Sequence, residues 1–234
     1  MKLFSGLFPG GGKGLCDALE VKGGVTALIG SGGKTSLMYH LAGELSRRGT
    51  VIITTSTHIR KPEQFPFAAT AEETRRLLAE KKCVCIGTEA ADGKLTAPAF
   101  AGWETMAEYV LVEADGAKGR PLKAHADYEP VIPAGCDNVI CVVGASGFDQ
   151  PVAFAVHRPE LFTAAMSVGE QTKVTPVLAA QAVEKEHLYT RVFLNQTDAL
   201  GGLKANWQVR EFAKEISGPV VSGSLRQGIW EKIK

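Results

Sequence analysis

The sequence lacks a long hydrophobic run, and it lacks a surplus of charge of either sign. No apolar stretch reaches the about 18–20 residues that a membrane span needs. The chain carries 26 Lys and Arg against 25 Asp and Glu, a formal net charge of +1. Because positive and negative charges are so nearly equal, the chain as a whole provides no electrostatic footprint for nucleic acid or for an anionic membrane surface. We therefore expect neither partner, and we expect any basic patch to be local and the size of a small ligand.

Cysteine is scarce as well, and its spacing does not match a zinc site. The five cysteines are an odd number without the paired spacing of such a site. Cys83, Val84 and Cys85 alternate as strand residues do. We interpret the cysteines as buried free thiols, with a metal- or selenium-binding pair as the alternative. The N-terminal segment breaks at Pro9 and a glycine cluster before a secretory apolar core builds up, which predicts a cytoplasmic protein.

What the sequence does contain is an alternation of strand-like and helix-like segments, which is typical of a parallel sheet. A chain of 234 residues is about the size of one α/β domain, so we expect a single domain over 1–234. Apolar runs predict strands at 25–29, 51–55, 83–86, 109–113, 139–143, 192–194 and 219–221, and periodic stretches predict helices at 37–47, 71–81, 177–187 and 205–216. Segments at about 116–133 and 144–173 are expected to be long functional loops or insertions. The predicted fold class is α/β, a three-layer αβα arrangement with a mostly parallel sheet whose ligands bind beyond the carboxyl ends of the strands.

A glycine-rich turn, GSGGKTS, joins the first predicted strand to the first predicted helix. A full Walker A pattern would place a glycine at position 28, which is leucine, so the strict pattern fails. The remaining context is that of a P-loop NTPase-like fold, because glycines let backbone N–H groups converge on phosphate oxygens at a helix N-terminus. The predicted phosphate ligands are Gly30, Ser31, Gly32, Gly33, Lys34, Thr35 and Ser36. A glycine-rich turn without a ligand is the alternative.

Acidic and hydroxyl side chains follow two other predicted strands. Glu113 and Asp115 end the strand at 109–113, where a carboxylate beside a phosphate loop usually holds Mg²⁺ or its water. We therefore expect them to act with Lys34 in catalysis, the alternative being an acidic turn. Thr55 is expected to complete the metal shell together with Thr35, unless it belongs to a solvated strand end.

The segment VFLNQTD, at 192–198, predicts contacts to a nucleotide base. GTPases place Asn-Lys-x-Asp after the corresponding strand and a small Ser-Ala-type turn after the next one, so Asn195, Asp198 and Ser222 are the candidates. Gln196 stands where the lysine would pack on the base. We expect Mg²⁺ with GTP or ATP, and GTP is favoured because a carboxylate accepts both N–H groups of the guanine edge.

A basic segment follows the acidic pair and predicts a second ligand. Its candidates, with the earlier His58, are Lys118, Arg120, Lys123 and His125. Three fixed positive charges close to the γ-phosphate side suit an anionic molecule such as the pterin-phosphate part of a molybdenum cofactor. A solvated basic loop is the alternative interpretation.

The chain resembles a known family, the YqeC-type selenium-dependent hydroxylase accessory proteins. The resemblance runs from about Leu15 to the C-terminus and rests on GSGGKTS, TTSTHI, VEADGAKGRPLKAHADYEPVIP, VHRPE and LNQTD. It implies a part in the maturation of molybdenum-cofactor hydroxylases, so the cofactor or a client hydroxylase becomes an expected partner. The resemblance says more about the pathway in which the protein acts than about its molecular reaction.

The residues and the resemblance together predict a Mg²⁺-dependent nucleotide-binding protein with slow phosphoanhydride hydrolysis. One rival is a small ATP-dependent kinase or ligase, because the glycine spacing also resembles the loop of Mur-type amide ligases. The other is a scaffold that binds a nucleotide without hydrolysing it. Turnover with and without candidate acceptors distinguishes the three.

Overall fold

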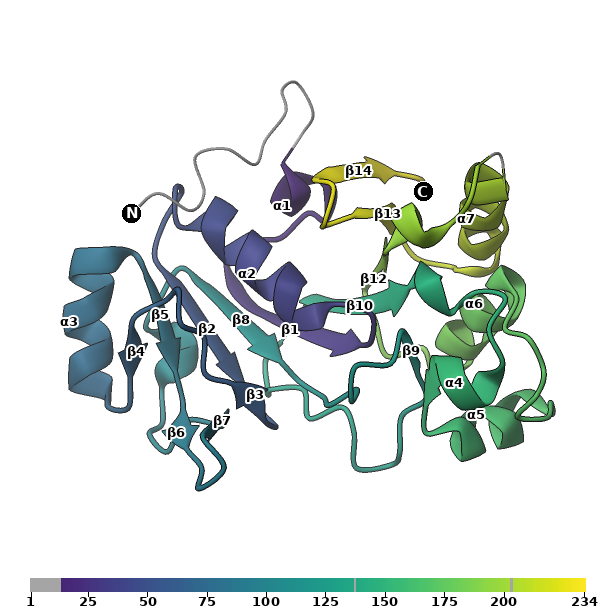
Figure 1. Cartoon of the computed structure of the whole chain (residues 1–234). Coiled ribbons are helices and arrows are strands. Elements are labelled where there is room, and N and C mark those ends of the chain that lie inside the picture. Colours follow the sequence, from purple (N-terminus) through teal and green to yellow (C-terminus); the bar gives the residue numbers. More distant parts are fainter. Residues whose placement is uncertain (1–13, 137, 203) are drawn as a thin grey trace.

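Nine strands form one central sheet, ordered β14-β13-β12-β10-β1-β8-β2-β5-β4 (Figure 1). The computed structural model describes residues 14–136, 138–202 and 204–234, so most of the N-terminal segment lies outside the described residues. All neighbouring strands are parallel except β13 and β14. The strands are β1 (Gly24–Gly30), β2 (Val51–Thr55), β4 (Phe67–Ala68), β5 (Cys83–Ile86), β8 (Tyr109–Glu113), β10 (Asn138–Gly144), β12 (Arg191–Asn195), β13 (Val220–Ser224) and β14 (Ile229–Lys232). The mostly parallel sheet is confirmed.

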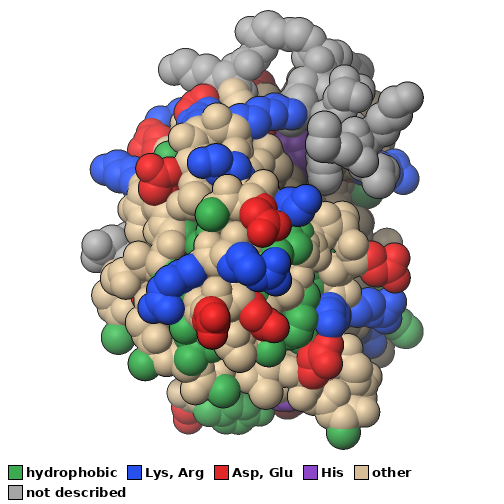
Figure 2. All heavy atoms as spheres, turned by 90° about the vertical axis from the view of Figure 1, so that its left-hand side faces the viewer, with side chains coloured by type: hydrophobic (Ala, Val, Ile, Leu, Met, Phe, Trp, Pro, Cys, Tyr) green, Lys and Arg blue, Asp and Glu red, His purple; other side chains and the backbone are tan. Residues whose placement is uncertain are grey.

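Helices cover both faces of this sheet and make three layers. They are α1 (Leu15–Ala18), α2 (Lys34–Leu45), α3 (Ala71–Lys81), α6 (Pro176–Glu186) and α7 (Lys204–Glu215). The α3 and α6 helices begin where threonines accept hydrogen bonds from the backbone of the first turn, as helix N-caps do. The side of the molecule that carries α3 shows lysine, arginine and acidic side chains intermingled (Figure 2).

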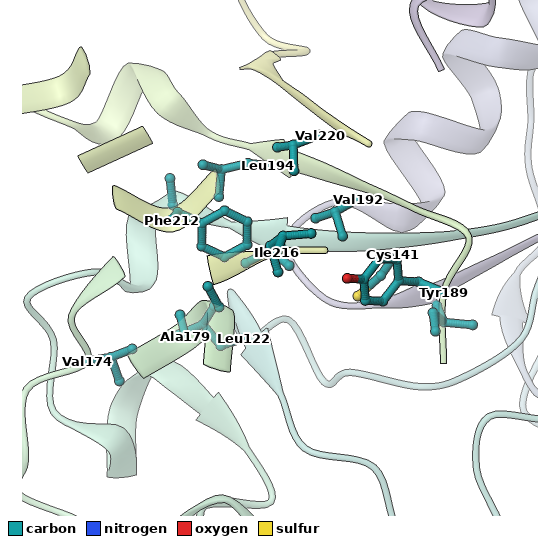
Figure 3. Close-up of a cluster of buried hydrophobic side chains, with 14 of the residues drawn as sticks. Leu122, Cys141, Val174, Ala179, Tyr189, Val192, Leu194, Phe212, Ile216 and Val220 are labelled. Carbon is teal, nitrogen blue, oxygen red and sulfur yellow. The ribbon is translucent and has the colours of Figure 1, made fainter. Parts of the chain in front are cut away.

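Strand residues alternate between two cores, as a period of two requires. On β10, Ile140 and Val142 pack beneath α1 and α2, whereas Cys141 packs into the core beneath α6 and α7 (Figure 3). Cys83 and Cys85 likewise lie together in the α2-side core, and Val84 faces the other side. Cys16, Cys83, Cys85 and Cys141 are buried free thiols, and Cys136 is half-buried.

Two small sheets flank the carboxyl ends of the central strands. One consists of β3 (Ile59–Arg60), β7 (Lys94–Thr96) and β6 (Thr88–Glu89). The other pairs β9 (Leu122–Lys123) with β11 (Val156–His157), and so joins the two segments that the sequence set apart as insertions.

Short helices complete the chain, namely η1 (Trp103–Thr105), η2 (Ala145–Gly147), α4 (Val152–Ala155), α5 (Pro159–Met166) and η3 (Thr197–Ala199). The second insertion therefore contains four elements, η2, α4, β11 and α5. Among the described residues, no helix is both long and apolar enough to span a bilayer.

Candidate functional site

The glycine-rich turn closes tightly between β1 and α2. Gly30 and Gly32 have φ values of 85° and 91°. A Cβ at Gly30 would lie 2.4 Å from the carbonyl oxygen of Val142, and one at Gly32 would lie 2.4 Å from Gly144, so only glycine fits. Gly33 caps α2 without a side-chain hydrogen bond, which leaves the first N–H groups of the helix available to an anion. Leu28, where Walker A would have glycine, is a buried residue of β1.

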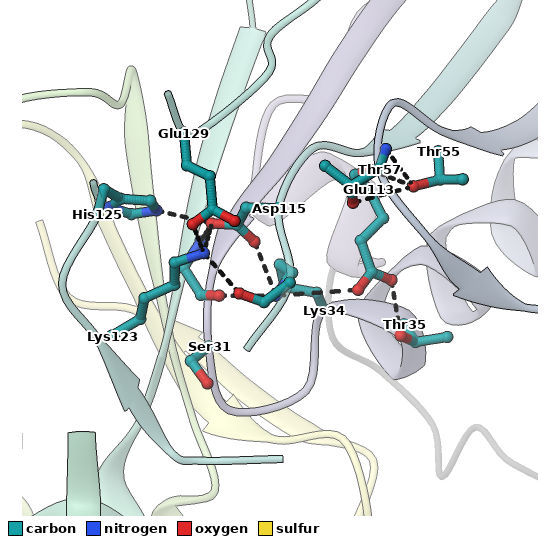
Figure 4. A network of polar contacts seen from close by, with 12 residues as sticks. Ser31, Lys34, Thr35, Thr55, Thr57, Glu113, Asp115, Lys123, His125 and Glu129 are labelled. Atoms are coloured by element: carbon teal, nitrogen blue, oxygen red, sulfur yellow. Dashed lines mark hydrogen bonds and ion pairs between the residues drawn. The ribbon is translucent and has the colours of Figure 1, made fainter. Parts of the chain in front are cut away.

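Lys34 is held inside the protein by this turn and by the acidic pair. Its ammonium group donates to the carbonyl oxygen of Gly30 at 2.7 Å. It lies 2.9 Å from Asp115 Oδ1 and 3.8 Å from Glu113 Oε1, and the residue is 4% exposed. Lys34 therefore stands between the two carboxylates (Figure 4).

Glu113 faces the open side of the loop. The hydroxyl of Thr35 donates to its Oε2 at 2.6 Å. Burial raises the pKa of Glu113 against the opposing effects of the Lys34 ammonium and the Thr35 hydrogen bond. A carboxylate beside a threonine hydroxyl supplies hard oxygen donors, and Mg²⁺ keeps several waters and substrate oxygens, so two protein ligands suit it. The described residues contain no group of three or more His, Cys, Asp or Glu that would make a complete protein cage.

Asp115 has a different environment. Its Oδ2 accepts from the Gly30 N–H at 2.8 Å and lies 2.6 Å from His125 Nε2 and 3.4 Å from Lys123 Nζ. Burial would raise its pKa, but the His125 hydrogen bond and the ammonium groups of Lys34 and Lys123 outweigh it and lower the pKa to about 2. The side chain is fully buried. Asp115 thus fastens the phosphate loop, and we narrow the candidate metal ligands to Thr35 and Glu113.

Lys123 and His125 point inward, which corrects their expected place at a second ligand. Lys123 Nζ donates to Glu129 Oε2 at 2.6 Å and to the Gly116 carbonyl at 2.5 Å. His125 Nδ1 lies 2.6 Å from Glu186 Oε2. Burial opposes protonation of His125, but the hydrogen bonds to Asp115 and Glu186 prevail and raise its pKa.

The remaining predicted ligands also divide into a residue that is hydrogen-bonded within the protein and residues that line a pocket. Thr55 is buried, donates to the Glu113 carbonyl at 2.8 Å and accepts from the Thr57 N–H at 3.0 Å, so its hydroxyl ties β2 to β8. His58, Lys118 and Arg120 line a pocket of about 530 Å³ together with the phosphate loop.

A second pocket, of about 660 Å³, opens on the opposite side of the α2 N-terminus. Asn195 lines it, but its Nδ2 donates to the Gly32 carbonyl at 2.8 Å and its Oδ1 accepts from the Leu225 N–H at 3.2 Å. Asn195 therefore braces the loop. Asp198 also lines this pocket and forms an ion pair with Arg226, while Ser222 is buried in β13 and is not among the lining residues.

Sequence reasoning missed several charged residues of the site. Glu129 and Glu186 complete the buried network, and Arg226 pairs with Asp198. Glu129 lies within the long motif VEADGAKGRPLKAHADYEPVIP, and this place in the motif was a signal that could have identified it as a site residue. Glu186 and Arg226 had none, because only the tertiary fold brings them to the site.

More than half of the chain matches the sequence model of a known family. The model described as YqeC protein matches residues 26–160 of the 234 residues. The chain belongs to the YqeC family. The matched segment contains the phosphate loop, Glu113 and Asp115, whereas Asn195 and Asp198 lie outside it.

This YqeC-family chain is similar to a relative from Escherichia coli and to a solved archaeal structure. "Uncharacterized protein YqeC" of Escherichia coli (strain K12) is 32% identical over an alignment of 153 residues, and the match covers 57% of this chain and 57% of that protein. The chain thus spans little more than half the length of that relative. The 54 kDa protein of the signal recognition particle from Aeropyrum pernix K1, solved in complex with GDP, matches with a TM-score of 0.41 and 17% identity, covering 91% of this chain and 44% of its own.

Proposed function

We propose that this protein binds a nucleoside triphosphate with Mg²⁺ and hydrolyses its terminal phosphoanhydride slowly. The observation that carries the proposal is the hydrogen bond of 2.6 Å between Thr35 and Glu113 at the mouth of a glycine loop that opens a helix. It brings together a metal-binding hydroxyl, a carboxylate and free backbone donors. The two pockets share Gly33, Ser36 and Gln196, which lie at or beside the start of α2 or after β12.

Each residue has a defined task in this proposal. The backbone N–H groups of the loop and the Lys34 ammonium bind the β- and γ-phosphates. Thr35 and Glu113 would hold Mg²⁺, which neutralises charge that develops on the phosphate oxygens. Glu113, whose pKa burial raises, is also placed to orient a water on the open side of the loop. Lys34 must exchange part of its contact with Asp115 for the phosphates, because its ammonium is already engaged.

The base would lie in the 660 Å³ pocket, where Asp198 favours guanine over adenine. A carboxylate accepts the ring N–H and the exocyclic amine of guanine together, whereas adenine offers neither donor in that arrangement. For the biological role, the family resemblance supports an accessory part in the maturation of molybdenum-cofactor hydroxylases, with the cofactor or a client hydroxylase as partner.

Calorimetric titration with GTP and ATP in Mg²⁺, together with phosphate release, tests the proposal. Lys34→Ala should weaken triphosphate binding by about 100-fold, since a charge-assisted contact is lost. Lys22→Ala, an exposed lysine preceding β1, makes the same chemical change away from the loop and should bind normally. Unchanged affinity in Lys34→Ala would exclude the phosphate loop. Tight binding without turnover would instead support a non-hydrolysing scaffold.

A further inference from the structure

The 530 Å³ pocket extends beyond the phosphate loop to a wall that no nucleotide contact explains. The phosphate loop and Glu113 form one side of it, and strands β3 and β7 contribute Arg60 and Lys94. Pockets of about 300–1,000 Å³ accommodate whole small molecules. If the base occupies the other pocket and the phosphates lie on the loop, the end beside β3 and β7 remains for a second molecule.

The wall brings two like charges directly opposite each other. β3 and β7 pair antiparallel, with Arg60 opposite Lys94 and Ile59 opposite Leu95. Ile59 and Leu95 are buried, so the two cations project from the other face of the small sheet. Like charges at opposed positions destabilise a strand pair. An anion bound between them would remove that repulsion.

The two cations are only partly neutralised by the protein itself. Lys94 Nζ lies 2.7 Å from Asp92 Oδ2, an exposed pair that water screens. Within residues 14–136, 138–202 and 204–234, no carboxylate lies within 4.0 Å of Arg60. The guanidinium of Arg60 is thus available for a bidentate contact to phosphate.

The opposite wall is also cationic. Lys118 and Arg120 come from the segment after β8, and Arg120 donates to the carbonyl oxygen of Phe154, which fixes the position of its guanidinium. Among the described lining residues the one carboxylate is Glu113, which already accepts from Thr35. By contrast, the α3 side of the molecule carries both signs intermingled (Figure 2). The excess of positive charge in this pocket is therefore local, in a chain whose net charge is +1.

We infer that this pocket binds a second small molecule through a phosphate or pyrophosphate group, held between the Arg60–Lys94 pair and the Lys118–Arg120 wall. The site rests on the proposed function for the place of the nucleotide, whose γ-phosphate would face it. Arg60 and Lys94 set the affinity for this second molecule, and they contribute nothing to the base pocket.

Pyrophosphate titration into protein saturated with a non-hydrolysable GTP analogue tests the site, with Mg²⁺ in excess over both ligands. The wild type should bind pyrophosphate, and the double variant Arg60→Ala, Lys94→Ala should bind it at least about tenfold more weakly. Affinity for the analogue should change less than about threefold. Lys61→Ala is the matched control, because Lys61 neighbours Arg60 but pairs with Glu89 and lies over the ring of Phe67. It should bind both ligands as the wild type does.

Three outcomes overturn the inference: no pyrophosphate binding to the loaded wild type, equal binding by the double variant, or an equal loss of both ligands in it. If the analogue itself fails to bind, the proposed function fails, and pyrophosphate is then titrated into the free protein. Loss in the double variant with retention in Lys34→Ala would still support the pocket, and the reverse would place pyrophosphate on the phosphate loop.

Discussion

The phosphate loop has two sides, and two carboxylates only two residues apart in the chain show how different these sides are. On the open side, Glu113 contacts Thr35 and lines a pocket, and burial raises its pKa. On the closed side, Asp115 accepts from Gly30 and faces His125, and its pKa is lowered to about 2 (Figure 4). A carboxylate whose charge is already compensated has little left for a ligand, whereas Glu113 remains available.

In the proposed function, this difference assigns a structural role to the side with Asp115 and a chemical role to the side with Glu113. The closed side is a buried network in which Asp115 connects to Lys123, and Lys123 to Glu129. Such a network is costly to form but strongly destabilising to break, because removing one partner leaves others charged and unpaired. The network thus holds the loop in place, and in the proposed function the open side carries the reaction.

The largest expected effect is on the closed side. Asp115→Asn should lower the free energy of unfolding by about 3–5 kcal/mol, because Lys34, Lys123 and His125 lose their shared counter-charge. Urea denaturation measures it. Asp92→Asn, which removes an exposed carboxylate paired with Lys94, should leave the unfolding free energy nearly unchanged. A loss below about 1 kcal/mol for Asp115→Asn would show that the network does not stabilise the fold.

The next effect belongs to the open side. Glu113→Gln should reduce phosphate release by about 100-fold, roughly 2.7 kcal/mol, while nucleotide affinity changes only a few-fold. The amide keeps the size of the side chain and an acceptor for Thr35, so stability should remain close to that of the wild type. Glu108→Gln, at the exposed start of the same strand region, is the control. Equal losses in binding and turnover would mean that Glu113 serves binding alone.

The sequence predicted the central sheet well because its strands are local, uniformly apolar runs. All seven predicted strands belong to the nine-stranded sheet, and Ala71–Lys81 is a helix with the expected bounds. The helix after the loop begins at Lys34, before its first apolar residue, because the loop and not the periodicity sets its start. Strands of two or three residues, such as β3 and β7, have no periodic signal and were missed.

The two sides of the loop could not be told apart from the sequence. Glu113 ends strand β8 and Asp115 follows it, and their roles separate through tertiary contacts, which bring His125 to Asp115 and Glu186 to the other ring nitrogen of His125. Lys123 carries the same charge as Lys118 and differs from it only in burial. Arg60 and Lys94 meet through antiparallel pairing of distant segments, which no spacing reveals.

A smaller effect should appear as a pH dependence of the stability that the closed side contributes. Asp115 and Glu186 raise the pKa of His125 above its ordinary value of 6.5. Its stabilisation is therefore fully present below about pH 6.5 and is lost as the pH rises through the higher pKa of the folded state. The difference in unfolding free energy between wild type and His125→Gln should narrow over that rise. A difference that is constant with pH would mean that folding does not shift the pKa of His125.

The smallest effect concerns the base pocket, where Asp198 is already engaged. A hydrogen bond from Ser224 and the nearby guanidinium of Arg226 lower the pKa of Asp198, so the carboxylate is charged. Arg226 is 79% exposed, and an exposed ion pair contributes about 0–1 kcal/mol. If Asp198 binds guanine, releasing it from Arg226 therefore costs at most about fivefold in affinity. Arg226→Ala should raise GTP affinity by up to that factor and leave ATP affinity unchanged.

Competition titrations with GTP, ATP and xanthosine triphosphate measure this effect, and Asp198→Asn completes the comparison. The amide replaces an acceptor with a donor, so it should weaken GTP and favour xanthosine triphosphate, whose edge carries a carbonyl where guanine has its amine. A parallel loss of GTP and ATP in Arg226→Ala would mean that the guanidinium packs on the base in place of the lysine absent at Gln196. Equal affinity of the wild type for GTP and ATP would instead leave Asp198 as a turn residue held by Ser224 and Arg226, with no part in choosing the base.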